Sequence, residues 1–186
     1  MVLKETPVCN FGEKAIDFEL RGIDGKTWSL ADCTGKNGIL LMFICNHCPY
    51  VKAIQSRLVN DTLKLIDSSI NSVAIMSNDP ADYPEDSFEN MQKIAAEYNY
   101  PFPYLFDETQ EVAKAYGAIC TPDFFGYNAS LELQYRGRLD DSGIKPPSID
   151  NKHELLEAMI EVANTGKGPK QQIPSIGCSI KWKNNA

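Results

Sequence analysis

A run of apolar residues from Ile39 to Ile44 ends directly at a pair of cysteines, and this junction constrains the fold more than any other part of the chain. Asn37-Gly38 precedes the run, as expected of a short buried strand. After it, apolar residues recur with the period of an amphipathic helix that begins near Cys48: Val51, Ile54, Leu58, Leu65 and Ile66. The sequence therefore predicts that Cys45 and Cys48 lie where a buried strand meets the first turn of a helix.

This position of the two cysteines favours thiol chemistry. A helix N-terminus has unpaired N–H groups and a partial positive charge, which stabilise a thiolate. Residues three apart share a helix face, so Cys45 and Cys48 can form a small disulfide with little backbone movement. A disulfide that closes so short a loop restrains little of the chain, so we expect it to serve thiol-disulfide exchange. His47 adds an imidazolium that stabilises the thiolate and makes the disulfide more oxidising.

Composition limits the class of protein and its partners. With 186 residues, 43% of them hydrophobic, the chain is expected to form a single domain over residues 1–186, with an unassigned tail from about residue 167. The net charge of -7 argues against nucleic acid or an anionic membrane as a partner.

The N-terminal residues also bear on location. They include Lys4, Glu5 and Lys14 and no continuous apolar segment, so we expect no signal peptide. No apolar run approaches the ~20 residues of a membrane span. We therefore expect a cytoplasmic protein, in which cysteines are catalytic, metal-binding or buried rather than a disulfide framework: Cys9, Cys33, Cys45, Cys48, Cys120 and Cys178.

Strand and helix patterns alternate along the rest of the chain. The predicted order is a β-hairpin at residues 16–30, the cysteine-bearing strand and helix, a strand at 72–77, a helix at 87–98, a strand at 104–106 and a short helix ending at Gly117. Asp86 is the predicted N-cap of the second long helix. A second hairpin at 123–136, a polar insertion at 140–150 and a last helix, with a capping box of Asn151 and Glu154 and an end at Gly166, complete the pattern. It predicts an α/β fold, a central mixed β-sheet flanked by helices on both faces, with an N-terminal β-hairpin extension.

A Cys45-Asn46-His47-Cys48 motif after a buried strand, followed far along the chain by Thr121-Pro122, resembles the thioredoxin-like superfamily. The segment Asp17-Phe18-Glu19-Leu20…Asp24-Gly25-Lys26 resembles its redoxin branch, which includes the alkyl hydroperoxide reductase and thiol-specific antioxidant proteins. The resemblance covers roughly residues 15–165. It implies a thiol-disulfide oxidoreductase without metal or organic cofactor, whose partners are a dithiol electron donor and protein or small-molecule disulfides.

The resemblance also implies roles for single residues. Cys45 would be the attacking thiolate and Cys48 the resolving one. Pro122 would be a cis proline beside the disulfide, with the Thr121 backbone offered to a substrate chain. His47 precedes the second cysteine as it does in the disulfide-forming and disulfide-isomerising members.

Two alternatives remain open. Cys45-Asn46-His47-Cys48-Pro49 also fits the peroxiredoxin motif Thr-x-x-Cys-Pro with Cys in the Thr place, so that Cys48 would attack peroxide, and Arg136 or Arg138 would replace the family's arginine. A closed zinc site completed by other cysteines, in a non-enzymatic or redox-sensing module, is the second alternative.

Four further side chains have an expected role or environment. Cys120 and Cys178 are candidate additional redox thiols. For Cys120, burial as a small apolar side chain is the favoured alternative. For Cys178, a resolving thiol in the tail and packing of Ile180 and Trp182 are equally good interpretations. His153 is expected on a solvated helix face. Asp86 is grouped with the acidic residues that we expect to be solvated, which are Asp79, Asp82, Glu85 and Asp86.

Overall fold

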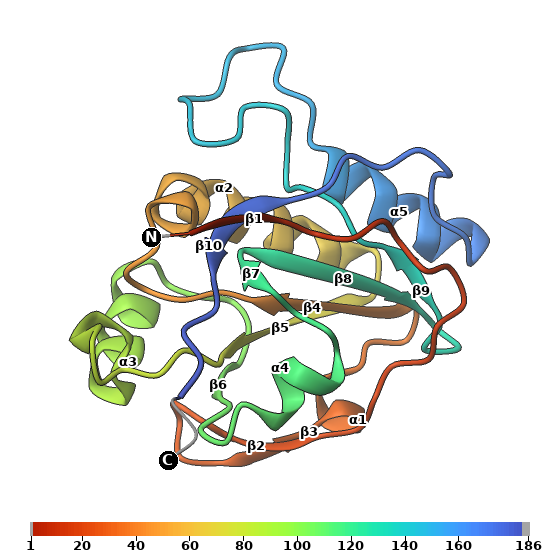
Figure 1. Ribbon diagram of the computed structural model, residues 1–186. Coiled ribbons are helices and arrows are strands. Elements are labelled where there is room, and N and C mark those ends of the chain that lie inside the picture. The colour runs from red at the N-terminus through yellow and green to blue at the C-terminus, as the bar shows by residue number, and fades with distance from the viewer. Residues whose placement is uncertain (1, 184–186) are drawn as a thin grey trace.

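The structure is a computed structural model that describes residues 2–183, and a central mixed sheet crosses its middle (Figure 1). The strands of this sheet lie in the order β3-β2-β6-β5-β4-β8-β9. Strands β5 and β6 are parallel, β4 and β8 antiparallel, and the Ile44 N–H after β4 donates to the Ile75 carbonyl of β5. The fold class predicted from the sequence is confirmed.

The elements have the following bounds. The strands are β1 Leu3–Glu5, β2 Glu19–Gly22, β3 Thr27–Ser29, β4 Gly38–Phe43, β5 Ile70–Met76, β6 Tyr104–Phe106, β7 Cys120–Thr121, β8 Asp123–Asn128, β9 Leu133–Tyr135 and β10 Ile176–Ser179. The helices are α1 Leu30–Cys33, α2 Pro49–Asp67, the 3-10 turn η1 Pro84–Asp86, α3 Phe88–Glu97, α4 Glu111–Ala115 and α5 Glu154–Thr165.

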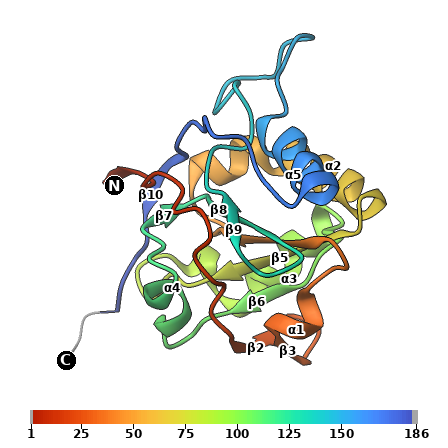
Figure 2. The same cartoon turned by 90° about the vertical axis from the view of Figure 1, so that its right-hand side faces the viewer.

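Strand β4 is the centre of two hydrophobic layers because its side chains alternate between the faces of the sheet. Leu40 and Met42 pack in one cluster with α2, α3 and α5. Ile39 and Leu41 pack in the other with α1 and α4. Figure 2 shows α2 and α5 on one side of the sheet and α1 and α4 on the other. A strand buried on both faces reads as a continuous apolar run, which is why β4 was recognisable.

The backbone at the start of β4 approaches β8 closely. Gly38 has φ +138°, and a Cβ there would lie 2.1 Å from the Tyr127 carbonyl oxygen. Only glycine therefore allows this strand to begin where it does, which fixes the register that carries Phe43 to the edge of the site.

Both predicted hairpins are present, β2–β3 and β8–β9. The expected N-caps of two helices are wrong. Ser87, not Asp86, caps α3, since its hydroxyl accepts the Asn90 N–H. Helix α5 begins after His153 without a side-chain cap, so the capping box of Asn151 and Glu154 is not formed.

Two polar side chains lie in environments that differ from those predicted. Asp86 is fully buried rather than solvated, while Asp82 and Glu85 are exposed as expected. His153 is only partly exposed, because its Nδ1 lies 2.9 Å from Oδ1 of the buried Asp61. Within residues 2–183, no helix combines the length and the apolar character that crossing a bilayer requires.

The tail forms a second sheet, β1-β10-β7, that joins both ends of the chain to the centre of the protein (Figure 1). Strand β10 pairs antiparallel with β1 and with β7, which directly precedes Pro122. The segment that the sequence left unassigned therefore lies beside Thr121.

Candidate redox site

The two cysteines of the motif lie at the junction that the sequence predicted. Strand β4 ends at Phe43, Cys48 is the N-cap of α2, and Pro49 occupies its first turn, where the missing N–H costs nothing. The side chains of Cys45 and Cys48 are both buried, at 1% and 0% exposure. The site is therefore enclosed by other parts of the chain, and these determine its chemistry.

Thr121 lies against both sulfur atoms. The Thr121-Pro122 peptide bond is cis, as expected. Cys45 Sγ lies 3.1 Å from Thr121 Oγ1, and Cys48 Sγ lies 3.2 Å from the Thr121 carbonyl oxygen, which accepts a hydrogen bond from the protonated thiol. The structure thus brings together four predicted site residues: Cys45, Cys48, Thr121 and Pro122.

The two thiols differ strongly in acidity. A hydrogen bond from Cys45, with others from Cys178 and the Val51 N–H, lowers the pKa of Cys48 to about 5 despite its burial. Burial raises the pKa of Cys45 well above its usual value, and the hydrogen bond to Cys48 and the charge of Asp86 add to this. The hydrogen bond from Cys45, helped by Cys178 and by the Val51 N–H in the first turn of α2, therefore favours a thiolate on Cys48, whereas the resemblance implied one on Cys45.

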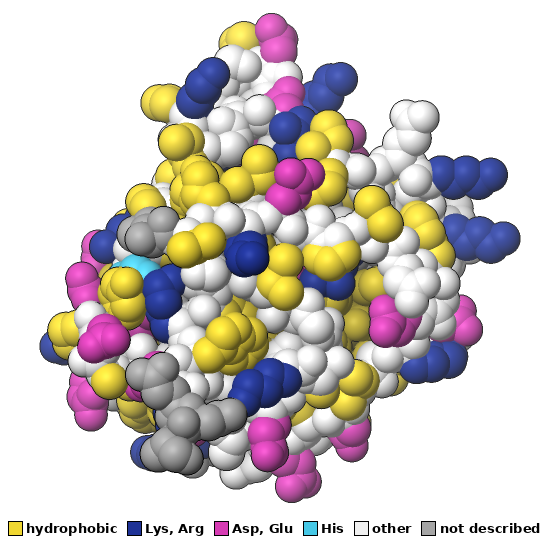
Figure 3. Space-filling model, in the orientation of Figure 1, with side chains coloured by type: hydrophobic (Ala, Val, Ile, Leu, Met, Phe, Trp, Pro, Cys, Tyr) yellow, Lys and Arg dark blue, Asp and Glu magenta, His cyan; other side chains and the backbone are white. Residues whose placement is uncertain are grey.

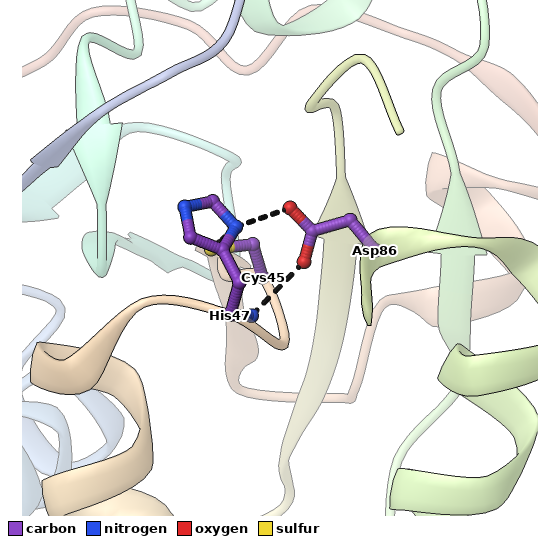
Figure 4. A group of neighbouring side chains, drawn as sticks. All are labelled: Cys45, His47 and Asp86. Atoms are coloured by element: carbon purple, nitrogen blue, oxygen red, sulfur yellow. Dashed lines mark hydrogen bonds and ion pairs between the residues drawn. The ribbon is translucent and has the colours of Figure 1, made fainter. Parts of the chain in front are cut away.

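His47 is held by a buried carboxylate, that of Asp86 (Figure 4). His47 Nδ1 lies 2.6 Å from Asp86 Oδ2 and 3.7 Å from Cys45 Sγ. The imidazole stacks on Tyr83 with 4.1 Å between the ring centroids. Its Nε2 has no hydrogen-bond partner among the described residues.

Asp86 also holds the backbone of the motif. Its Oδ1 accepts the N–H groups of Asn46, at 2.8 Å, and of His47, at 3.1 Å, and its Oδ2 accepts the Asn78 amide at 2.9 Å. Although burial alone would raise it, these bonds and that from His47 hold the pKa of Asp86 below its usual value. Asp86 is thus a site residue that sequence reasoning missed, since nothing in a run of acidic residues marks the one that turns inward.

Two further cysteines lie near the pair. Cys178 of β10 is fully buried, and its Sγ lies 2.9 Å from Cys48 Sγ. Cys120 is also fully buried, with its Sγ 3.7 Å from the Pro122 carbonyl oxygen, and burial raises its pKa. Cys33 lies in the cluster on the opposite face of the sheet.

Potential metal ligands meet at the same place. Ligand atoms of Cys45, His47 and Asp86 all lie within 4.8 Å of one another. Both carboxylate oxygens of Asp86, however, already accept N–H donors, which explains the cluster without an ion. Of the cysteines that could complete a zinc site, Cys178 is the one in contact with Cys48.

The arginines that a peroxidase reading requires are engaged elsewhere. Arg136 Nη2 lies 3.0 Å from Asp123 Oδ2, and the guanidinium stacks over Phe125. Arg138 Nε lies 2.5 Å from Glu154 Oε2. Neither supplies a hydrogen bond to Cys48 within residues 2–183. The peroxidase alternative is therefore not favoured.

A cavity of about 160 Å³ adjoins Pro122 on the side of the tail. Its lining is mainly apolar and includes Tyr50, Ile54, Phe124, Leu139, Ile144 and Ile176. Figure 3 shows hydrophobic side chains exposed on the face that carries β1 and β10.

The fold and the site together define a class: a redox protein of the thioredoxin-like superfamily, with a Cys-x-His-Cys motif facing a cis proline. Residues 11–142 match the model of the AhpC/TSA family, and the chain belongs to this family.

Similar proteins agree with this assignment. The chain is 24% identical over 146 residues to the thiol-disulfide oxidoreductase ResA of Halalkalibacterium halodurans, covering 78% of this chain and 77% of that protein. The crystal structure of an uncharacterized conserved protein from Geobacillus kaustophilus superposes with a TM-score of 0.91 at 46% identity, over 100% of this chain and 99% of that one. A secreted disulfide oxidoreductase of Mycobacterium tuberculosis shares the fold, with a TM-score of 0.57 at 19% identity over 78% and 95% of the chains. These findings support a redox function of the thiols.

Proposed function

We propose that this protein is a thiol-disulfide oxidoreductase in which Cys45 and Cys48 alternate between dithiol and disulfide. The observation that carries the proposal is the contact of both sulfur atoms with Thr121, immediately before the cis Pro122. The similarity to a thiol-disulfide oxidoreductase supports it.

The acidity of the two thiols indicates how exchange proceeds. In the oxidised protein, a substrate thiolate attacks Cys45 Sγ, the Cys45–Cys48 bond breaks, and Cys48 leaves as a thiolate. A leaving group of low pKa leaves faster, and the Val51 N–H and neighbouring thiols stabilise Cys48 in this form. A second substrate thiolate then attacks the substrate sulfur of the mixed disulfide and releases Cys45.

The electrons and protons balance over this cycle. The substrate dithiol loses two electrons and two protons and becomes a disulfide, while Cys45 and Cys48 gain the same electrons. In the reverse direction Cys45 attacks a substrate disulfide, Cys48 resolves the mixed disulfide, and a dithiol donor restores the reduced protein. Stabilisation of the Cys48 thiolate favours the reduced form and thus makes the disulfide a stronger oxidant.

His47 and Asp86 position the reacting sulfur. Cys45 has to lose its proton to attack, and the His47 Nδ1–H, which donates to Asp86, lies 3.7 Å from its sulfur, where it can stabilise the thiolate. Asp86 fixes the ring by the bond to Nδ1 and fixes the loop by the bonds to the Asn46 and His47 N–H groups. We infer that His47 stabilises the Cys45 thiolate and that Asp86 is a positioning residue.

A turnover assay tests the proposal. A fluorogenic peptide disulfide is reduced with dithiothreitol as electron donor, with wild-type protein, Cys45→Ser, Cys48→Ser and the control Cys9→Ser. We expect turnover by the wild type and by Cys9→Ser, because Cys9 lies outside the site, and loss of turnover in the two motif variants. Wild-type turnover equal to that of Cys45→Ser would show that the pair does not carry out the exchange.

A further inference from the structure

Strand β10 places a third sulfur atom against the motif. In its antiparallel pairing with β7, Cys178 lies opposite Thr121, the same residue that contacts Cys45 and Cys48. On its other edge β10 pairs with β1, where Cys178 lies opposite Leu3. Cys178 is therefore fixed on both sides by backbone ladders.

The approach of β10 to Thr121 is close enough to require a glycine. A Cβ on Gly177 would lie 2.1 Å from the Thr121 carbonyl oxygen. Since no real Cβ tolerates such a contact, Gly177 allows the two backbones to meet at this distance. The position of the Cys178 sulfur thus depends on the close approach of the Gly177 backbone to the Thr121 carbonyl.

Cys48 lies between two sulfur atoms. Its Sγ is 2.9 Å from Cys178 Sγ, about 0.9 Å longer than a disulfide bond of ~2.05 Å. On its other side, Cys48 Sγ accepts a hydrogen bond from the Cys45 thiol. Either neighbour can therefore bond to Cys48 after a small movement.

We propose that Cys178 is a third redox thiol of this site, which exchanges with the Cys45–Cys48 disulfide to form Cys48–Cys178. This inference rests on the proposed function. The Cys178 thiolate attacks Cys48 Sγ, the Cys48–Cys178 bond forms, and the Cys45–Cys48 bond breaks with Cys45 as the leaving thiolate. Cys45 takes up a proton in place of the one lost by Cys178, so the step is an isomerisation without net oxidation.

The surroundings of the two outer thiols are compatible with exchange in both directions. Burial raises the pKa of Cys45 and of Cys178, so the step replaces one buried thiol by another of similar character. The positive charge of Lys181, whose side chain is held at the Ser179 carbonyl, acts in the opposite direction on Cys178. The product retains one disulfide while Cys45 becomes a thiol again, and Cys48–Cys178 links the start of α2 to the C-terminal strand.

The test is disulfide mapping after oxidation of the reduced protein with one equivalent of diamide, followed by alkylation and peptide mass spectrometry. We expect Cys45→Ser to form Cys48–Cys178, and Cys178→Ser to form Cys45–Cys48 alone. Cys45→Ser/Cys120→Ser should still form the Cys48–Cys178 bond, whereas Cys45→Ser/Cys178→Ser should not crosslink Cys48. Recovery of Cys48 and Cys178 as alkylated thiols from oxidised Cys45→Ser would overturn the proposal.

A backbone variant tests the same step with all cysteines present. Gly177→Ala pushes β10 away from Thr121, so the ratio of Cys48–Cys178 to Cys45–Cys48 in the oxidised protein should fall below that of the wild type. Ser179→Ala on the same strand is the control and should leave the ratio unchanged. An unchanged ratio in Gly177→Ala, or wild-type protein that shows only Cys45–Cys48 at all times, would count against the third thiol.

These outcomes separate the two proposals. Turnover of the peptide disulfide by wild-type protein, together with an uncrosslinked Cys45→Ser variant, retains the proposed function and rejects the role of Cys178. Absence of turnover together with a Cys48–Cys178 bond rejects the proposed function and leaves the contact between these two thiols established.

Discussion

Replacement of Asp86 by alanine should destabilise the protein more than any other single change to an acidic residue of its loop. The carboxylate accepts four buried donors: the N–H groups of Asn46 and His47, His47 Nδ1 and the Asn78 amide. A buried donor left without an acceptor costs about 1–3 kcal/mol. Because water can enter the space left by the side chain, we take the low end for each donor and expect a loss of about 4 kcal/mol, consistent with the ~3–5 kcal/mol for breaking a buried pair.

The isosteric variant Asp86→Asn refines the expectation. Its remaining carbonyl oxygen can accept both backbone N–H groups, while the new amide faces two donors, so half the bonds are lost and about 2 kcal/mol is expected. Asp82→Asn is the matched control, because Asp82 is exposed in the same loop; it should stay within about 0.5 kcal/mol of the wild type.

Urea denaturation of the reduced proteins at pH 7 measures these differences as free energies of unfolding. The expected order of stability is wild type and Asp82→Asn, then Asp86→Asn, then Asp86→Ala. The reasoning is refuted if Asp86→Ala lies within about 1 kcal/mol of Asp82→Asn, since a buried acceptor of four donors cannot be lost at so small a cost.

Three further expectations concern charge and packing. Because the pKa of Cys48 is lowered from 9.0 to about 5, the unfolded chain binds more protons between these values. Between pH 5 and pH 9, the unfolding free energy of the reduced protein should therefore rise by about 1.4 kcal/mol per pH unit. This stabilisation by the Cys48 thiolate is lost as the pH falls through about 5. Denaturation at several pH values should show that the rise with pH is smaller in Cys48→Ala by about 1.4 kcal/mol per unit. Arg136→Met leaves the buried Asp123 carboxylate unpaired and should lower the free energy of unfolding by about 3–5 kcal/mol. Arg138→Met breaks a partly exposed ion pair and should lower it by about 1 kcal/mol or less. Equal losses of the two variants in urea denaturation would contradict this distinction. Gly38→Ala should lower the melting temperature by about 2–4 °C for each kcal/mol of lost stability, because its Cβ would collide with the Tyr127 carbonyl. An unchanged temperature in calorimetry would show that β4 can shift without cost.

The parts of the fold that were predictable are those in which a local pattern decides the structure. The apolar run of β4 and the helical period of α2 depend on neighbouring residues only, so the junction at Cys45 and Cys48 was visible in the sequence. The cis Pro122 followed from resemblance rather than from any local preference.

The missed parts depend on contacts between segments far apart in the chain. The sequence does not distinguish Asp86 from the other acidic residues of its loop. Only the fold shows that its side chain accepts the N–H groups of Asn46 and His47. The four residues of β10 carry no period long enough to recognise, and their strand exists because β1 and β7 offer two edges to pair with. The same pairing determines where Cys178 lies.

The acidity of the cysteines was also beyond the sequence. The helix N-terminus predicted a thiolate at the motif without saying on which sulfur, whereas the acidity of Cys48 depends first on the hydrogen bond from Cys45 and then on those from Cys178 and the Val51 N–H. Cys45, three residues before the N-cap, is opposed in its ionisation first by burial, then by its hydrogen bond to Cys48 and by the charge of the Asp86 carboxylate.

Trapping of the mixed disulfide is the most direct test of the exchange reaction. A biotinylated peptide disulfide is added to the Cys48→Ser/Cys178→Ser variant, in which neither neighbouring thiol can release the adduct, and the labelled cysteine is located by peptide mass spectrometry. We expect a stable adduct on Cys45 and none in the variant that also carries Cys45→Ser. An adduct on Cys9, Cys33 or Cys120 in place of Cys45, or no adduct at all, would contradict it.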